Sequence, residues 1–239
     1  MIEHVNQLGA DAPHTGPAPT GTTAAVWSIN TAAHTIGGHH VNDAHTILDT
    51  NERDKAARLL RPGDRHRYVA SHLALHILIG AYLNLPPHTI PFTRETCPCC
   101  GGPHGRPALT GHNLHFSLSH SGDLAYLALA AHPVGIDIEQ TPTPTAVNDI
   151  LHSLHPTETQ ELTNLPPTQQ PEALARIWTR KEAILKATGT GLAQGLTHPY
   201  VGTHPTPPTI PGWILTDLPT PRHYTAALAT TSPDNRHEK

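Results

Sequence analysis

The stretch from Val134 to Glu139 reads VGIDIE, a run in which apolar and acidic side chains alternate. Successive side chains of a β-strand point to opposite faces of the sheet, so this alternation predicts a half-buried strand. Val134, Ile136 and Ile138 form its apolar face. Asp137 and Glu139 project together from the other face, where two neighbouring negative charges require a cation.

Two further strands precede this run. Residues 114–118 alternate apolar with polar side chains, and residues 124–130 form a second apolar run. The turn sequences SGD at 121–123 and HP at 132–133 separate the three runs. Consecutive strands joined by short turns pair antiparallel, so the sequence predicts a three-stranded antiparallel meander.

The rest of the chain repeats one order of elements. Pro62-Gly63 and Pro86-Pro87 end two helical patterns in the first half, and Thr157 and Gln160 form a capping-box pattern at a helix start in the second. The predicted order is two helices and then three strands, given twice. The predicted helices are 51–61, 64–84, 157–165 and 171–188, and the later strands lie near 200–201 and at 213–218 and 224–229.

This repetition predicts an α+β fold of two similar lobes. Each lobe has two helices and a three-stranded antiparallel sheet, and the cleft between the lobes is the expected active site. Thr and Pro dominate residues 140–146, which mark the join. The predicted parts are a flexible N-terminal segment 1–22, an N-terminal lobe 23–139, a C-terminal lobe 140–231 and a flexible tail 232–239.

The composition argues against several classes of protein. Of 239 residues, 37% are hydrophobic, which suffices for a buried core. Fifteen Lys and Arg against 19 Asp and Glu give a formal charge of -4, which argues against nucleic-acid binding. No apolar run approaches the roughly 20 residues of a membrane span, and the first residues lack the plan of a signal peptide. We therefore expect a cytoplasmic protein that binds neither nucleic acid nor membrane.

A third carboxylate belongs with the pair on the strand. Trp178, Glu182 and Lys186 are spaced by four, which places them in one row of a helix. Asp137, Glu139 and Glu182 without a convincing His or Cys partner form an all-oxygen site, which suits Mg²⁺ and substrate phosphates. The alternative is a solvated strand end and an ordinary helix ion pair.

The sequence LSHS at 118–121 ends a strand with groups that can donate to a phosphate: hydroxyls, backbone N–H groups and an imidazole. By strict alternation, His120 falls on the same face as Phe116. We expect the turn that begins there to break the alternation; otherwise His120 is a core histidine.

Three motifs stand in a fixed order: FSLSHS at 116–121, GIDIE at 135–139 and WTRKEAILKATG at 178–189. In order and spacing they resemble the signatures of Sfp-type 4'-phosphopantetheinyl transferases. The resemblance covers about residues 47–229, including His66-Arg67 and the segment around Arg106. It implies a pseudo-twofold monomer of two α+β lobes with coenzyme A in the cleft between them, which fits the duplicated order of elements.

The resemblance also implies roles for individual residues. Asp137, Glu139 and Glu182 would hold Mg²⁺ together with the pyrophosphate of coenzyme A, and Lys186 would neutralise that pyrophosphate. Arg106 stands where many family members carry lysine, which keeps the charge but changes its geometry. The residues that would hold the nucleotide end and its 3'-phosphate are Ser119, His120, Arg67 and Arg106, with Arg53, Lys55 and Arg58 as further basic contacts.

The implied reaction is transfer of phosphopantetheine to a carrier protein. A serine of an apo acyl or peptidyl carrier protein attacks the β-phosphorus of coenzyme A, and 3',5'-ADP leaves. Asp137 and Lys186 would act with Glu182, the candidate base. Carrier proteins of these systems are acidic, so Arg176 and Arg180 are expected to meet one electrostatically. The motifs do not specify a fatty-acid, polyketide or nonribosomal peptide pathway.

Two other functions remain open from the residues alone. Cys97 and Cys100, with His112, His115 or His104, approach a zinc-ligand spacing, which would suit a zinc-binding or adaptor protein without catalysis. The three carboxylates would also serve a Mg²⁺-dependent nucleotide phosphohydrolase. All three cysteines lie in this one segment, so no disulfide can join distant parts of the chain.

Overall fold

The structure, a computed structural model, describes residues 4–191 and 195–233. Its first half is built on a four-stranded sheet with the order β1-β2-β8-β7. β1 runs parallel to β2, and the other neighbouring pairs are antiparallel. The strands are β1 (Asn6–Leu8), β2 (Ala24–Asn30), β7 (His115–Ser121) and β8 (Leu124–Ala130).

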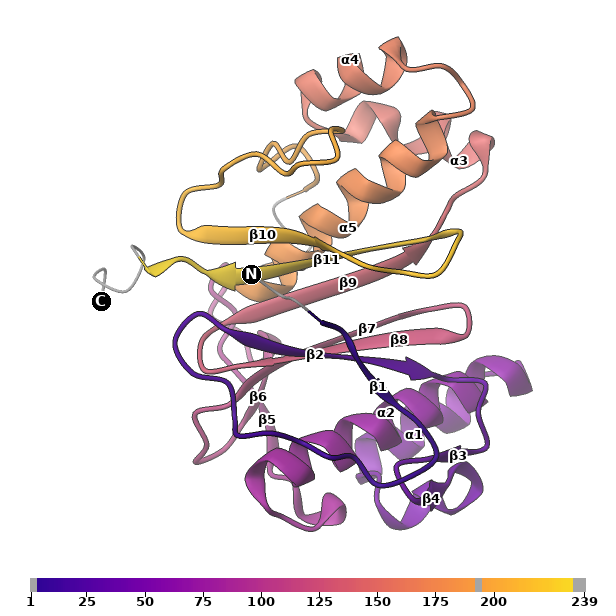
Figure 1. The fold of residues 1–239 in the computed structure, drawn as a ribbon, viewed down its shortest axis with the longest axis vertical. Coiled ribbons are helices and arrows are strands. Elements are labelled where there is room, and N and C mark those ends of the chain that lie inside the picture. The colour runs from indigo at the N-terminus through magenta and orange to yellow at the C-terminus, as the bar shows by residue number, and fades with distance from the viewer. Residues whose placement is uncertain (1–3, 192–194, 234–239) are drawn as a thin grey trace.

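Two helices cover one face of this sheet (Figure 1). α1 (Thr50–Arg58) begins with a capping box, in which the side chains of Asp49 and Glu52 each accept a hydrogen bond from the other's backbone N–H. α2 (Pro62–Leu83) is longer, and its apolar residues share a core with β2, β7 and β8. Burial of that apolar face supplies most of the stabilisation of this layer.

The second half is built on a three-stranded antiparallel sheet with the order β10-β11-β9. α5 (Gln170–Thr188) packs against this sheet, and α3 (Pro144–Ile150) and α4 (Pro156–Asn164) lie at its outer end (Figure 1). The strands are β9 (Val134–Gln140), β10 (Trp213–Leu218) and β11 (Tyr224–Thr231).

The two sheets also pack against each other. Val26 and Tyr126 of the first sheet and Ile136, Ile138 and Leu228 of the second belong to one apolar cluster. The layers therefore follow the order helices, sheet, sheet, helices, as Figure 1 shows. This mixed arrangement confirms the predicted α+β class.

The predicted three-stranded meander is wrong in its third strand. β7 and β8 form the expected hairpin, but β9 pairs with β11 and belongs to the second sheet. β2 and β1, which the sequence analysis did not identify, complete the first sheet. The alternation of side chains reveals a strand and its faces, but not which strand it pairs with.

Helix starts differ from the prediction at two points. Pro62 begins α2 instead of ending a helix, because the first turn needs no N–H from that residue. α4 is capped by His155, whose ring accepts from the N–H of Thr157, while Glu158 accepts from the backbone of His155. The capping box therefore lies two residues before the predicted pair, Thr157 and Gln160.

Part of the segment predicted to be flexible at the N-terminus forms β1, an edge strand. The strand predicted near 200–201 is absent from the structure, which has irregular backbone there. Residues 234–239 of the predicted tail lie outside the described residues. The short elements are β3 (Thr35–Ile36), β4 (His39–His40), β5 (Phe92–Arg94), β6 (Pro107–Leu109) and the 3-10 helices η1 (Val41–Thr46), η2 (Pro87–Thr89) and η3 (Leu151–Ser153).

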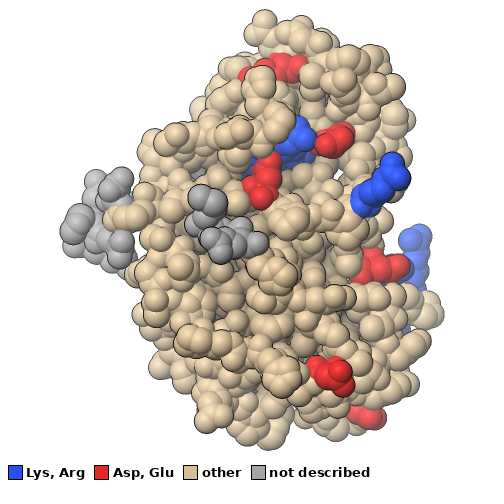
Figure 2. Space-filling view, in the orientation of Figure 1, with Lys and Arg blue, Asp and Glu red and all other residues tan. Residues whose placement is uncertain are grey.

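Charged side chains are few and scattered on the face shown in Figure 2. This agrees with a sequence in which only 14% of residues are charged. No helix of the described chain is long and apolar enough to cross a membrane.

Candidate active site

Serine side chains of β7 connect the first sheet to β9 of the second. The Ser117 hydroxyl accepts a hydrogen bond from the N–H of Ile136 at 3.1 Å. The Ser119 hydroxyl donates to Asp137 Oδ1 at 2.7 Å, and the next serine on this face donates to Glu139 at 2.9 Å. These alternate serines fix β9, and so orient both of its carboxylates. The sequence prediction that Asp137 and Glu139 share one face is confirmed.

Asp137 is buried, with 2% of its surface exposed. Its Oδ1 accepts from Lys186 Nζ at 2.6 Å and from Ser119 at 2.7 Å. Lys186 Nζ also donates to the carbonyl of Ile136 at 3.2 Å. The second oxygen, Oδ2, is buried and has no hydrogen-bond partner among the described residues. A buried carboxylate oxygen without a donor is costly, and a cation would satisfy it.

Glu139 and Glu182 complete a cluster of three carboxylates around Asp137. Burial, and then the negative charge of Asp137, raise the pKa of each glutamate, although Lys186 opposes this rise. The oxygens of these three carboxylates are not all within 4.8 Å of one another. In the described chain, the one group of three possible metal ligands that meets this distance consists of other residues. Repulsion among carboxylates and the unpaired oxygen nevertheless fit a divalent cation, because hard oxygen donors are what Mg²⁺ prefers.

The position of Glu182 and Lys186 depends on how closely α5 approaches β9. A Cβ atom at Gly135 would lie 1.9 Å from the carbonyl oxygen of Ala183 and 2.5 Å from the N of Ala187. Only glycine permits this approach, which brings one turn of α5 directly over the strand. The side of α5 that carries Glu182 and Lys186 therefore faces the carboxylates of β9.

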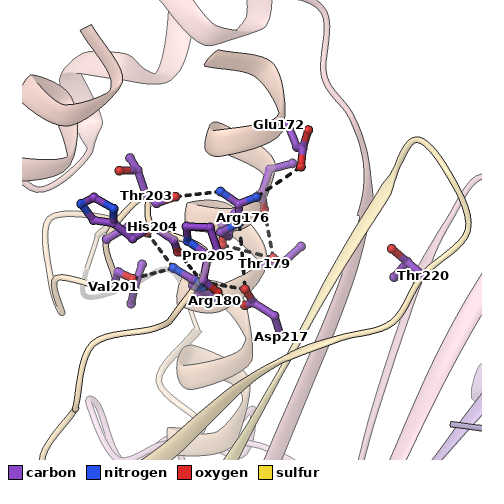
Figure 3. Close-up of polar contacts among 12 residues, drawn as sticks. Glu172, Arg176, Thr179, Arg180, Val201, Thr203, His204, Pro205, Asp217 and Thr220 are labelled. Atoms are coloured by element: carbon purple, nitrogen blue, oxygen red, sulfur yellow. Dashed lines mark hydrogen bonds and ion pairs between the residues drawn. The ribbon is translucent and has the colours of Figure 1, made fainter. Parts of the chain in front are cut away.

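Arg180 anchors α5 from the side of the helix away from Asp137. Its guanidinium donates to both oxygens of Asp217, at 2.8 and 2.6 Å, and to the carbonyls of four loop residues (Figure 3). It is fully buried, so the prediction that it meets a carrier protein is wrong. Arg176 is largely buried and donates to Glu172 and to the carbonyl of Thr203 (Figure 3). The loop carbonyls that Arg180 binds belong to Val201, Gly202, His204 and Pro205.

Lys181 has a structural role as well. Its Nζ lies 2.9 Å from Glu158 Oε2, with both side chains fully buried, and donates to the carbonyl of Pro199. Burial lowers the pKa of Lys181, and the charge of Glu158 opposes this. Lys181 and Glu182, which are neighbours in the motif WTRKEAILKATG, therefore differ in role. Lys181 binds Glu158 of α4, and Glu182 faces the carboxylate cluster.

A pocket of about 940 Å³ lies beside this cluster. That volume is at the upper end of the range for small-molecule and cofactor sites, roughly 300–1,000 Å³. Arg106, His120 and Lys186, all predicted to bind coenzyme A, line it. Asp49, Glu52 and the cation Lys55 line the wall formed by α1, and Tyr68 and His72 of α2 lie next to it.

Arg106 reaches from this pocket to the end of α5. It donates to Glu95 at 2.6 Å and to the carbonyl of Ala187. Its Nε is buried and finds no acceptor within the described chain. A buried guanidinium N–H without an acceptor, on the wall of a pocket, is suited to an anionic ligand.

His120 is exposed and lines the pocket, so it is not a core histidine. The expected break in alternation is wrong, however, because β7 continues through Ser121 and pairs His120 with Ala125. Partial burial, and then the positive charges of Lys186 and Lys55, lower the pKa of His120. The imidazole therefore lies among cations, as a phosphate-binding group would.

Four predicted ligands of coenzyme A do not line the pocket. Arg53 donates to the carbonyl of Leu48 and, at 3.0 Å, to Thr50 Oγ1. Arg58 is exposed on α1, and Arg67 donates to Asp123 at 2.7 Å. Ser119 is buried and bound to Asp137. Sequence reasoning did not identify Tyr68 or assign His72 to the site, because a helical spacing shows which residues share a face but not which face borders a cavity.

Lys55, Tyr68 and His72 form a stack along one wall of the pocket. The Lys55 ammonium lies 5.2 Å from the centre of the Tyr68 ring, and that ring lies 3.9 Å from the ring of His72. Burial lowers the pKa of His72 to about 4, so this imidazole is neutral. The stack offers one exposed cation beside an aromatic surface.

Comparisons with known proteins agree along most of the chain. Residues 37–133 match the family model of the 4'-phosphopantetheinyl transferase N-terminal domain, and residues 133–232 match that of the 4'-phosphopantetheinyl transferase superfamily. The 4'-phosphopantetheinyl transferase HetI of Nostoc sp. is 33% identical over 199 residues, which cover 79% of this chain and 81% of HetI. The 4'-phosphopantetheinyl transferase Sfp of Bacillus subtilis is 26% identical over 160 residues, which cover 66% of this chain and 68% of Sfp.

Proposed function

This chain belongs to the 4'-phosphopantetheinyl transferase family, and from this premise we propose how its residues carry out the transfer. It is a transferase that moves phosphopantetheine onto carrier proteins. The zinc-binding or adaptor function without catalysis and the phosphohydrolase are not favoured, since neither accounts for the matches over both halves of the chain.

We propose that coenzyme A binds in the pocket of about 940 Å³. Four cationic side chains line it, those of Lys55, Arg94, Arg106 and Lys186, together with the imidazole of His120. A pyrophosphate and a 3'-phosphate need such groups, and hydrogen bonds between ionised partners are the stronger ones. Arg67 and Arg58, which lie outside the pocket, would then act by their charge at longer range.

Asp137, Glu139 and Glu182 are the residues that would hold Mg²⁺. The orphaned Oδ2 of Asp137 and the raised pKa values of the two glutamates support this assignment. When bound, the ion would supply charge stabilisation to the pyrophosphate oxygens. Lys186, which is 2.6 Å from Asp137, is placed to share that task.

The chain's own groups supply positioning and proton transfer. The serine hydroxyl of the carrier attacks the β-phosphorus of coenzyme A, the bond to the bridging oxygen breaks, and 3',5'-ADP leaves. Glu182 is our candidate for the group that accepts the serine proton. Burial and the charge of Asp137 raise its pKa in the metal-free protein, whereas a Mg²⁺ ion that it holds would lower it. Lys186 neutralises charge on the pyrophosphate, and the serines of β7 keep Asp137 and Glu139 in place.

The arrangement of the two sheets suggests how the protein is divided into lobes. We propose that the two sheets with their helices form the two pseudo-twofold lobes of a monomer, and that the pocket lies in the cleft between them. Because β9 belongs to the second sheet, the boundary between the lobes falls near residue 133 and not between the predicted parts 23–139 and 140–231. The residues that support this are on both halves of the chain: His120 and Arg106 in the first, and Lys186 in the second. The acceptor is an apo acyl or peptidyl carrier protein.

The observation that carries this proposal is the meeting of Asp137, Glu182 and Lys186 beside a cationic pocket. The test is intact mass spectrometry of several apo carrier proteins incubated with coenzyme A and this protein, with Mg²⁺ or with EDTA. A gain of one phosphopantetheine that requires Mg²⁺ supports it. Consumption of coenzyme A without a carrier protein would indicate a phosphohydrolase, and the absence of any reaction with every carrier would contradict the proposal.

A further inference from the structure

The loop between β5 and β6 gathers metal-binding side chains outside the active site. The sulfurs of Cys97 and Cys100 and a ring nitrogen of His104 all lie within 4.8 Å of one another, the one such group in the described chain. Cys100 Sγ lies 3.0 Å from His104 Nε2. Cys97 is buried, whereas Cys100 and His104 are exposed, so one side of the group faces solvent.

We propose that Cys97, Cys100 and His104 bind a zinc ion. Thiolate sulfur and imidazole nitrogen are donors that zinc prefers. Zn–S bonds of about 2.3 Å and Zn–N bonds of about 2.0 Å separate the ligand atoms of a tetrahedral site by roughly 3.5–3.8 Å. Small side-chain rotations bring these three atoms to that spacing. The fourth position of the tetrahedron faces solvent and takes a water molecule. The other two histidines that the sequence suggested as zinc ligands, His112 and His115, lie outside the group.

The backbone of this turn is folded around the first cysteine. The N–H of Cys97 donates to the carbonyl of Gly102 at 2.8 Å, and the N–H of Gly101 donates to the carbonyl of Cys97 at 2.9 Å. The backbone N–H groups of Cys99 and Cys100 hydrogen-bond the sulfur of Cys97. Zinc binds the thiolate, so donors aimed at this sulfur prepare the turn for the metal.

Gly102 allows the imidazole to lie beside the second cysteine. A Cβ atom at Gly102 would lie 2.9 Å from Cδ2 and 3.0 Å from Nε2 of His104, and 3.4 Å from Cys100 Sγ. Any side chain there would displace the ring from the sulfur. The arrangement of the donors therefore depends on a glycine at this position.

Polar contacts rather than a hydrophobic core hold the loop: Glu95 and Arg106 pair through backbone and side chain, and the N–H of Gly105 donates to the carbonyl of Glu95. β5 and β6 pair over only three residues each, and a short two-stranded hairpin is marginally stable in water. The residues between them, 95–106, include three glycines and two prolines and few apolar side chains. A metal that ties the loop to itself would supply what a core supplies elsewhere.

The zinc ion would also stabilise one wall of the active-site pocket. His104, Gly105 and Arg106 line that pocket, and Arg106 continues to the carbonyl of Ala187 at the end of α5. Loss of zinc should therefore weaken the binding of coenzyme A. This consequence rests on the proposed function, whereas the zinc content of the protein does not.

The first test is the metal content of the purified protein. Protein produced with zinc in the medium and purified without chelator should contain about one zinc per chain by plasma mass spectrometry. Cys100→Ser and His104→Ala should each reduce this at least about tenfold. His112→Ala is the control, because His112 is exposed and lies outside the group, and this variant should keep its zinc.

A second measurement does not depend on whether the variants fold. Cobalt(II) added to the metal-free wild-type protein should give thiolate-to-cobalt charge-transfer absorption, which added zinc removes. Three results would overturn the proposal: wild-type protein that takes up neither zinc nor cobalt, a Cys97–Cys100 disulfide in the purified chain, or a His112→Ala variant that loses zinc as Cys100→Ser does. Inactive protein with one zinc per chain would contradict the proposed function and leave the zinc site intact.

Discussion

At the scale of single residues, the carboxylate cluster that we propose as a Mg²⁺ site lowers the stability of the metal-free fold at neutral pH. A carboxyl whose folded pKa is raised binds its proton more tightly in the folded than in the unfolded chain. Its stabilising contribution is present below the unfolded pKa and is lost as the pH rises through the raised value. At neutral pH without metal, Glu139 and Glu182 therefore destabilise the fold.

Glu182→Gln should separate the two effects. We expect it to lower the rate of phosphopantetheine transfer at least about 100-fold, as for loss of one charge-stabilising group, and to raise the melting temperature in EDTA at neutral pH. Mass spectrometry and thermal unfolding measure the two effects. Glu172→Gln is the control, since Glu172 is exposed on the same helix and should leave the rate unchanged. If Glu182→Gln transferred phosphopantetheine as fast as the wild type, Glu182 would not belong to the site.

Lys186→Met should weaken coenzyme A binding. A hydrogen bond to a charged group contributes about 1.5–3 kcal/mol, which corresponds to an affinity loss of roughly 10–100-fold. Titration calorimetry measures this directly, and Lys186→Arg, which keeps the charge, should lose less. Unchanged affinity in Lys186→Met would show that the ammonium serves only Asp137.

His76 and Glu52 form a buried pair that makes stability depend on pH, with 2.8 Å between Nε2 and Oε2. Burial opposes the charged form of each, but the partner's hydrogen bond and charge outweigh it, so the pKa of His76 is raised and that of Glu52 is lowered. The contribution of His76 is fully present below its unfolded pKa of about 6.5 and is lost as the pH rises through the raised value. That of Glu52 is lost as the pH falls through its lowered value.

Urea unfolding of wild type and His76→Gln at several pH values tests this pair. The difference in free energy of unfolding between the two proteins should shrink as the pH rises from below about 6.5 through the raised pKa of His76, because the wild-type histidine then loses its proton. His112→Gln, an exposed position, provides the control. A difference that stays constant over this range would mean that the pair is not ionic.

At the scale of secondary-structure elements, α5 carries both the site and its own anchors. Residues of the same motif point in different directions around the helix: Glu182 and Lys186 towards β9, and Arg180 and Lys181 towards the loops and α4. The loop 199–205 has irregular backbone, and five of its carbonyls accept hydrogen bonds from these two cations. A buried cation thus replaces the hydrogen bonds that a strand would have made.

Arg180→Met should destabilise the whole second half by about 3–5 kcal/mol, because it leaves the carboxylate of Asp217 and four carbonyls without their donor. Arg176→Met, one turn earlier and bound to only one carbonyl, should cost less than about 1 kcal/mol. Urea unfolding measures both. Equal stability of the two variants would contradict the anchoring role.

At the scale of the whole molecule, the site exists because two separately built sheets meet. β9 is fixed on one side by the serines of β7 and on the other by α5, which lies in van der Waals contact over Gly135. Neither half of the chain holds the cluster alone, since Ser119 comes from the first and Glu182 from the second. Any change that separates α5 from β9 should therefore affect stability and catalysis together.

Gly135→Ala should separate α5 from β9. Its methyl group would lie 1.9 Å from the Ala183 carbonyl, so we expect a loss of about 3 kcal/mol or more in stability, together with a large loss of transfer activity in the protein that remains folded. Gly16→Ala is the control, because nothing lies within 4 Å of a Cβ there. A Gly135→Ala protein as stable and active as the control would show that the helix can withdraw without consequence.

The sequence by itself determined the local features of this protein: the α+β class, α5, the strands β7 to β9, and the shared face of Asp137 and Glu139. Each follows from a periodicity that neighbouring residues define. Tertiary structure alone decided that β9 leaves the meander for β11 and that Arg180 is buried. Pairing, burial and proximity are set by residues distant in the chain, and no local pattern encodes them.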